Sequence, residues 1–223
     1  MSNIEILGQS VSGLPLIAHS FPKTNLPKVL VVAGVHGDEI EGVALARGLL
    51  QSLLKDPSEL DLDLFLIPEV NPDGVLNKTR VNANGVDLNR NLPTQDWSPE
   101  AFNERYPPGP FAGSEPENKM LMQILDRLQP TLVISLHSFT PVLNINGDCH
   151  SVAKAIATHT NAPLSESMGY PTPGCLGTYA GLERAWPTLT YEVDRGWSID
   201  QVLKIHLPAL IQGLKTHADN MKG

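Results

Sequence analysis

The segment 28–54 constrains the fold most, because it reads as a buried strand, a tight turn and an amphipathic helix in direct succession. The run Val-Leu-Val-Val at 29–32 is apolar and mostly β-branched, which is typical of a strand buried on both faces. Gly34 and Gly37 then mark a turn, and the apolar residues of 40–53 mostly recur at a helical spacing. A strand followed at once by a helix predicts a layered α/β fold.

Two potential metal ligands lie at this strand-to-helix junction. His36 is in the turn, and Glu39 follows three residues later in or near the first helical turn. At that spacing an imidazole and a carboxylate can face the same point, and zinc accepts both ligand types. A single His-x-x-Glu pair also arises by chance, and a histidine in such a turn is more often a polar loop residue. The pair alone therefore leaves both interpretations open.

Length and charge narrow the functional classes. The chain has 223 residues, of which 41% are hydrophobic and 18% charged, and these values indicate one globular domain spanning 1–223. The net charge of −8 and the lack of a lysine- or arginine-rich tract disfavour binding to nucleic acid. No apolar run approaches about 18 residues, so no membrane-spanning helix is expected.

The N-terminus and the cysteines indicate the compartment. The first ten residues lack a basic segment followed by an apolar one, so we expect no secretory signal. Cys149 and Cys175 are the only cysteines, which fits a reduced protein. The sequence leaves open whether they meet in space. We expect a cytoplasmic protein.

The remaining regular structure is predicted from periodicity and turn residues. Strands are expected at 4–7, 14–20, 61–67, 131–136, 142–146 and 188–193, and further helices at 114–128, 152–160 and 198–217. Ser114 with Glu117, and Ser198 with Gln201, have the spacing of capping boxes. The segment Asn71-Pro-Asp-Gly is expected to break regular structure.

A long polar segment follows that break and extends to about residue 113. A loop of this length in a compact domain is usually functional or disordered. Arginines and asparagines are interleaved from Arg80 to Asn91, in the order RVNANGVDLNRN. Because planar guanidinium groups bind anions through paired hydrogen bonds, an ordered anion-binding segment is the alternative to disorder.

Two later strands carry further candidates. His137 follows the strand at 131–136, and ligand sites in open α/β sheets lie at the carboxyl edge of the strands. His36, Glu39 and His137 together form a set with a short-spaced pair and a distant third ligand, as in catalytic zinc sites. Glu192 interrupts the apolar strand at 188–193 and is the candidate general base, the alternative being a solvated glutamate at a strand end.

These motifs resemble those of the zinc carboxypeptidase family of the carboxypeptidase A type and, within it, of the short bacterial murein peptide amidases. The resemblance runs from about residue 29 to 193 and rests on His36-Gly-Asp-Glu39, Asn71-Pro-Asp-Gly74, Arg80, Gly85-Val-Asp-Leu-Asn-Arg-Asn91, Ser135-Leu-His137 and Thr190-Tyr-Glu192. It implies a three-layer α/β sandwich with a mixed central sheet. It also implies a hydrolase that cleaves the γ-D-glutamyl–diaminopimelate bond of cell-wall peptides.

The same resemblance implies how the metal and the base act. His36, Glu39 and His137 would bind one zinc ion (Zn2+) per chain. Glu192 would take a proton from the attacking water and carry it to the leaving amine.

It further implies how a small peptide substrate is held. Arg80 would stabilise the oxyanion, while Asn89 and Arg90 would bind the carboxylate of the leaving amino acid. Tyr179 is our candidate for the mobile tyrosine of the family. Asp38 departs from the digestive members, which have arginine two residues after the first zinc histidine. The departure affects the expected specificity more than the expected chemistry.

Two other functions stay open at this point. A zinc N-acyl amino-acid deacylase of the succinylglutamate desuccinylase and aspartoacylase group shares the His-Gly-x-Glu and Asp-Leu-Asn-Arg stretches. The full Gly-Val-Asp-Leu-Asn-Arg-Asn run and the Asn-Pro-Asp-Gly segment favour the peptidase. A noncatalytic binding module would be favoured by loss of a ligand or of the base, and neither is lost. The sequence does not determine the oligomeric state.

Overall fold

One mixed sheet of eight strands organises the computed structural model, which describes residues 2–101 and 103–222. In spatial order the strands are β1 (Asn3–Gln9), β2 (Pro15–Phe21), β4 (Asp63–Ile67), β3 (Lys28–Ala33), β5 (Leu132–Phe139), β8 (Thr188–Asp194), β6 (Val142–Asn146) and β7 (Leu164–Ser165). The central strands β4, β3, β5 and β8 are mutually parallel, while β2 and β6 pair antiparallel with β4 and β8. Their carboxyl ends therefore share one edge of the sheet.

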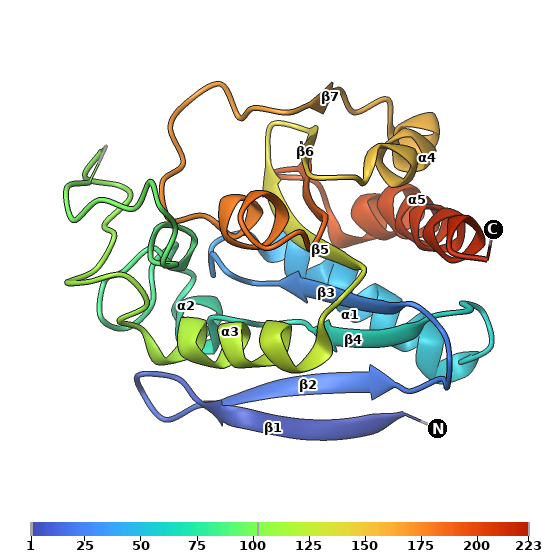
Figure 1. The fold of residues 1–223 in the computed structure, drawn as a ribbon, viewed down its shortest axis with the longest axis horizontal. Coiled ribbons are helices and arrows are strands. Elements are labelled where there is room, and N and C mark those ends of the chain that lie inside the picture. The colour runs from blue at the N-terminus through green and yellow to red at the C-terminus, as the bar shows by residue number, and fades with distance from the viewer. Residues whose placement is uncertain (1, 102, 223) are drawn as a thin grey trace.

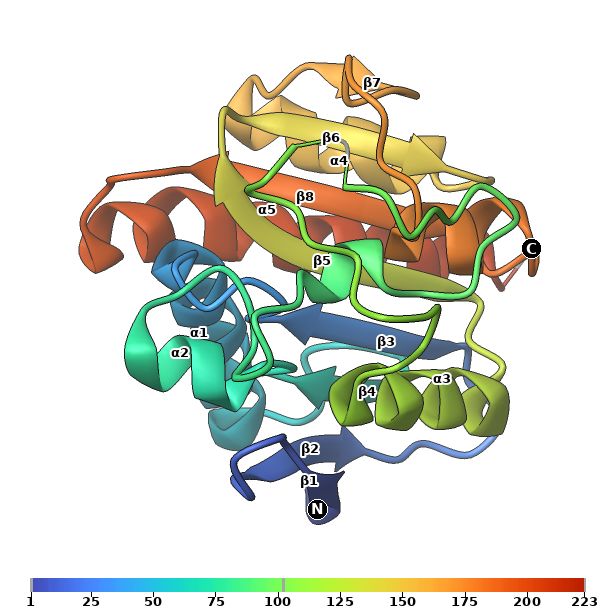
Figure 2. The same ribbon diagram turned by 90° about the vertical axis from the view of Figure 1, so that its left-hand side faces the viewer.

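Helices cover both faces of this sheet, as Figures 1 and 2 show. Helices α1 (Ile40–Lys55), α4 (His150–Thr160) and α5 (Ile199–Asn220) pack on one face, and α3 (Pro116–Leu128) packs on the other. The short helix α2 (Pro72–Asn77) follows β4, and the segment between α2 and α3, green in Figure 1, extends from one end of the sheet. The predicted three-layer α/β sandwich is confirmed.

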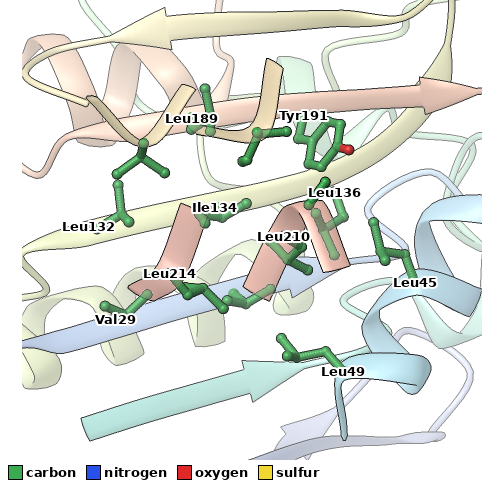
Figure 3. Packing of buried hydrophobic residues seen from close by; sticks show 14 of the residues in the cluster. Val29, Leu45, Leu49, Leu132, Ile134, Leu136, Leu189, Tyr191, Leu210 and Leu214 are labelled. Atoms are coloured by element: carbon green, nitrogen blue, oxygen red, sulfur yellow. The ribbon is translucent and has the colours of Figure 1, made fainter. Parts of the chain in front are cut away.

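Two hydrophobic clusters fill the space between the layers. The cluster on the α1, α4 and α5 side includes Ile134 and Leu210, which Figure 3 shows facing each other. The α3 side has its own cluster, with Leu121 and Leu125. In β3, Val29 and Val31 belong to the first cluster and Leu30 and Val32 to the second. A strand with both faces buried needs an unbroken apolar run, which is why the 29–32 run predicted β3.

The strands and helices predicted from the sequence are present, with ends shifted by up to three residues. The prediction for Asn71-Pro-Asp-Gly is wrong, because this segment begins α2. The side-chain oxygen of Asn71 accepts a hydrogen bond from the backbone N–H of Gly74 at 2.8 Å and so caps the helix. Pro72 occupies the first turn, where its missing N–H would have no helical partner.

One of the two predicted capping boxes is also wrong. Ser198 and Gln201 form theirs at the start of α5. At the start of α3, the Ser114 hydroxyl lies 2.9 Å from the side-chain nitrogen of Asn91, and Glu117 accepts from the N–H of Val11. Partners distant in the sequence have replaced the local cap.

Other expectations concern membranes and disulfides. Within the described ranges, no helix has the length and apolar character needed to cross a bilayer. Cys149 and Cys175 are buried and are not joined to each other.

Candidate active site

Three potential metal ligands converge where β3 and β5 end. His36 lies in the turn after β3, Glu39 immediately precedes α1, and His137 lies on β5 next to β3. Nδ1 of His36 and Nδ1 of His137 are each 2.8 Å from a different carboxylate oxygen of Glu39, and the two Nδ1 atoms are 3.2 Å apart. All three side chains are buried. Residues 101 positions apart meet because β3 and β5 are adjacent parallel strands.

This donor set fits a zinc ion. Nε2 of His36 is 3.1 Å from Oδ1 of Asp87, and Nε2 of His137 is 3.0 Å from the hydroxyl of Ser135. These partners occupy one nitrogen of each ring and direct the other toward Glu39, as outer hydrogen bonds do around metal-binding histidines. One potential ligand atom from each of the three residues lies within 4.8 Å of the other two. Two imidazoles and one carboxylate are a common donor set of catalytic zinc.

Burial and ion pairing together set the charges in this cluster. Burial disfavours charge on His36 and on Glu39. Attraction to Glu39 and Asp87 nevertheless raises the pKa of His36, and attraction to His36 and His137 lowers the pKa of Glu39. Burial also opposes ionisation of Asp87, yet His36 and Arg80 hold the pKa of this carboxyl well below its usual range. Asp87, to which the sequence motif assigned no role, therefore acts as a fixed anion that orients both His36 and Arg80.

Glu192 lies beside the ligands on the neighbouring strand. The parallel pairing of β5 with β8 aligns Glu192 with His137. Burial raises the pKa of Glu192 to about 7, with His137 lowering and Glu39 further raising it. Among the described residues, no partner donates a hydrogen bond to its buried Oε2. A buried carboxylate with a free oxygen beside metal ligands is suited to general-base chemistry.

The raised pKa predicts how pH affects the stability of the metal-free protein. At pH values between the pKa of Glu192 in the unfolded chain and its pKa of about 7 in the folded protein, unfolding releases a proton from Glu192. The free energy of unfolding of the wild type therefore falls as pH rises through this window. Glu192→Gln cannot ionise and escapes this loss. The variant should be more stable than wild type by under about 1 kcal/mol near pH 5 and by about 3 kcal/mol above about pH 8. Urea unfolding in the presence of a chelator measures both differences, and equal differences at the two pH values would contradict the assignment.

Arg80, Asn89 and Arg90 line the same cavity as His36, Glu39 and Glu192. Arg80 is fixed by Asp87, whose Oδ2 lies 2.9 Å from its Nε, and its Nη1 is 3.4 Å from Glu39. Asn89 accepts a hydrogen bond from the N–H of Leu176 through its side-chain oxygen, which leaves its NH2 group as a donor. Arg90 donates to the backbone oxygen of Asn89 at 2.6 Å, and its buried Nε has no partner in the described part of the chain.

Tyr179 is placed differently from our expectation. It lies in a π-helical turn, Gly177–Leu182, and its ring is buried in the cluster on the α3 side with the Arg184 guanidinium 3.5 Å from its centre. It does not line the cavity, so we do not retain it as a mobile substrate contact. Tyr106 and Tyr170 do line the cavity, and the available signal was a tyrosine in each of two proline-rich loops.

Asp38 pairs with the loop after β8. Its Oδ2 lies 2.7 Å from Nη2 of Arg195, and it is not among the residues that line the cavity. An arginine at this position would face Arg195 as a like charge, which explains why an acidic residue suits this chain.

A family model described as zinc carboxypeptidase matches residues 1–172. The chain belongs to the zinc carboxypeptidase family. It is therefore a hydrolase of a zinc-dependent family, which favours the peptidase over the deacylase and over a noncatalytic module. The matched range includes His36, Glu39, His137, Arg80, Asn89 and Arg90 but not Glu192, so the case for Glu192 rests on geometry.

Relatives within the zinc carboxypeptidases cover most of the chain. Murein peptide amidase A of Escherichia coli strain K12 is 37% identical over 187 residues, which are 78% of this chain and 75% of that protein. Murein peptide amidase A of Vibrio campbellii is 32% identical over 224 residues, covering 95% of this chain and 87% of that protein.

Solved structures share the fold. The crystal structure of the murein-tripeptide amidase of Escherichia coli O157 has a TM-score of 0.81 at 32% identity and covers 96% of this chain and 92% of that one. Carboxypeptidase A of Helicoverpa armigera has a TM-score of 0.83 at 19% identity, covering 98% of this chain and 68% of its own. The expected carboxypeptidase-like architecture is confirmed.

Proposed function

We propose that this zinc carboxypeptidase hydrolyses the γ-D-glutamyl–diaminopimelate amide of murein peptides. One observation carries the chemistry: the Nδ1 atoms of His36 and His137 converge on Glu39, and beside them lies Glu192, whose Oε2 has no partner within residues 2–101 and 103–222. The substrate class is supported by the two relatives named murein peptide amidase A, which align with most of the chain.

His36, Glu39 and His137 would hold one zinc ion per chain. When bound, zinc supplies a Lewis acid that polarises the scissile carbonyl and favours ionisation of water. Glu192 accepts the proton of the attacking water at its free Oε2 and then donates it to the departing amine, which leaves as a neutral group. Burial, which raises the pKa of Glu192 in the metal-free protein, favours return of the proton from its carboxyl to the amine.

Arg80 would stabilise the negative charge that develops on the carbonyl oxygen. Its guanidinium is held by Asp87 and lies next to the ligand Glu39, so it needs little reorganisation during the reaction. A fixed donor of this kind binds the transition state more tightly than the substrate.

Asn89 and Arg90 would bind the carboxylate of the leaving amino acid. Among the residues that the structure describes, neither the NH2 group of Asn89 nor the Nε of Arg90 has a partner, so both are available as donors, and both residues line the cavity. Charge-assisted hydrogen bonds of this type select substrates with a free carboxylate next to the cleaved amide.

The two arginines should therefore respond differently to substitution. Arg90→Ala should mainly raise KM for substrates with a free carboxylate, by a loss of about 1.5–3 kcal/mol. Arg80→Ala should mainly lower kcat, by roughly 10²–10³-fold. Steady-state kinetics on the two variants measures both quantities. A change confined to KM in both variants would show that Arg80 and Arg90 do not divide the work in this way.

A comparison of substrates tests the proposed function itself. The purified protein, loaded with zinc, is given L-Ala-γ-D-Glu-meso-diaminopimelate and, separately, N-succinylglutamate. We expect release of free diaminopimelate from the first and no release of glutamate from the second. The reverse outcome would assign the protein to the deacylase chemistry.

We also propose that the protein acts in the cytoplasm as a single catalytic domain. The two buried, unpaired cysteines support a reducing compartment. The ligands and the base come from adjacent strands of one continuous sheet and from the turn between β3 and α1, which supports one domain.

A further inference from the structure

One aromatic ring contacts two of the arginines that line the cavity, Arg80 and Arg90. The guanidinium carbons of Arg80 and Arg90 lie 4.8 Å and 5.0 Å from the centre of the Tyr106 ring. The ring of Tyr170 stacks against Tyr106, with centroids 6.4 Å apart and planes within 10°. Since the face of an aromatic ring attracts cations, Tyr106 acts on both guanidinium groups.

The backbone that follows Tyr106 is hydrogen-bonded to the 85–91 motif, which contains Arg90. The N–H of Asp87 donates to the carbonyl oxygen of Pro107 at 2.8 Å, and the side-chain NH2 of Asn91 donates to that of Pro108 at 2.8 Å. Residues on both sides of Arg90 therefore fix the position of the tyrosine. The Gly-Val-Asp-Leu-Asn-Arg-Asn run thus holds the ring as well as supplying the arginine.

The two arginines differ in how much they depend on this ring. Arg80 is held by the carboxylate of Asp87. Arg90 has no carboxylate partner in the described part of the chain; one Nη donates to the adjacent backbone oxygen of Asn89, and Nε is unpaired. The ring of Tyr106 and the backbone oxygen of Asn89 thus both orient the Arg90 guanidinium before substrate binds.

We propose that Tyr106 is a positioning residue that holds the Arg90 guanidinium ready for the substrate carboxylate. This inference rests on the proposed function only in that Arg90 is taken to bind that carboxylate. Without the ring, the Arg90 side chain would sample several rotamers. Substrate binding would then have to fix one of them, and the entropy lost in doing so would lower the affinity for substrate. The aromatic face of Tyr106 positions the guanidinium, and its phenol hydroxyl has no part in this.

Kinetics on matched variants tests the proposal. Tyr106→Leu should raise KM for the murein tripeptide by about 3- to 30-fold, the range for cation–π contacts that are partly removed from water, with a smaller change in kcat. Tyr106→Phe keeps the ring and should stay within about threefold of wild type. Phe111→Leu removes an exposed aromatic ring from the same segment, outside the cavity, and serves as the control for general damage.

A double-mutant cycle identifies the residue through which Tyr106 acts. In an Arg90→Ala background, Tyr106→Leu should change KM by less than about twofold, because the group that it positions is gone. An equal effect in both backgrounds would overturn the proposal. It would also be overturned if Tyr106→Phe were as damaging as Tyr106→Leu, since the hydroxyl would then be the contact that matters.

A measurement without substrate separates this inference from the proposed function. The Nε–H resonance of Arg90 in an NMR spectrum of the wild-type protein should be displaced by the ring of Tyr106. The displacement should persist in Tyr106→Phe and vanish in Tyr106→Leu. Persistence in Tyr106→Leu would overturn the proposal, whereas failure of the wild-type protein to cleave the tripeptide would count against the proposed function alone.

Discussion

Replacing Glu192 by glutamine is expected to lower kcat by at least roughly 10²–10⁴-fold, the range for loss of general acid–base catalysis. Glutamine keeps the size and polarity of the side chain but cannot accept and return a proton. The variant should fold, retain zinc and bind the tripeptide with little change in affinity. Stopped assays of diaminopimelate release measure kcat, and elemental analysis and calorimetry measure the zinc content and the substrate affinity of the same preparation.

The other outcomes of that experiment have distinct meanings. Loss of zinc would make Glu192 a ligand, and an unfolded variant would make it structural. Near-normal turnover would place the base elsewhere, and Glu69 and Glu183 would be the next glutamates to replace. Neither of these lines the cavity: Glu69 pairs with Arg47, and Glu183 accepts from the backbone N–H of Gln95.

Replacing His137 by alanine is expected to remove most of the bound zinc and, with it, the hydrolase activity. The substitution reduces three protein donors to two, and catalytic zinc sites commonly keep three. Elemental analysis after dialysis should give about one zinc per chain for wild type and a small fraction of that for the variant.

A matched histidine substitution provides the control. His159 is exposed on α4, away from the cavity, so His159→Ala should retain the wild-type zinc content and activity. Stoichiometric zinc in His137→Ala would show that the third ligand has been misassigned.

The parts of the fold that the sequence predicts are those in which the pattern of apolar residues in a segment matches the burial of that segment in the folded protein. The run at 29–32 is buried on both faces, and its apolar character already required this. The strand that ends near His137 was equally apolar, and two such strands in a layered α/β fold pair in parallel with their ends at one edge. The meeting of His36, Glu39 and His137 follows from that topology.

The failed local predictions share a physical cause. Ser114 and Glu117 have the spacing of a capping box, but their side chains bind Asn91 and the N–H of Val11 instead. A short polar motif offers a donor or acceptor without specifying its partner, so a distant residue with better geometry can take it. Asn71 shows the converse, because this apparent helix breaker accepts a hydrogen bond from one of the first N–H groups of a helix, that of Gly74.

The sequence by itself predicted the layers around the sheet, the candidate ligands His36, Glu39 and His137, and the acidic residue beside them. These predictions follow from the spacing at which apolar side chains recur along strands and helices. That spacing is set by local backbone geometry, so a short stretch of sequence reveals it. Only the tertiary structure decided that Tyr106 and Tyr170, rather than Tyr179, line the cavity, and that burial raises the pKa of Glu192. Loop side chains and desolvation depend on contacts between residues far apart in the chain, and no local pattern encodes those contacts.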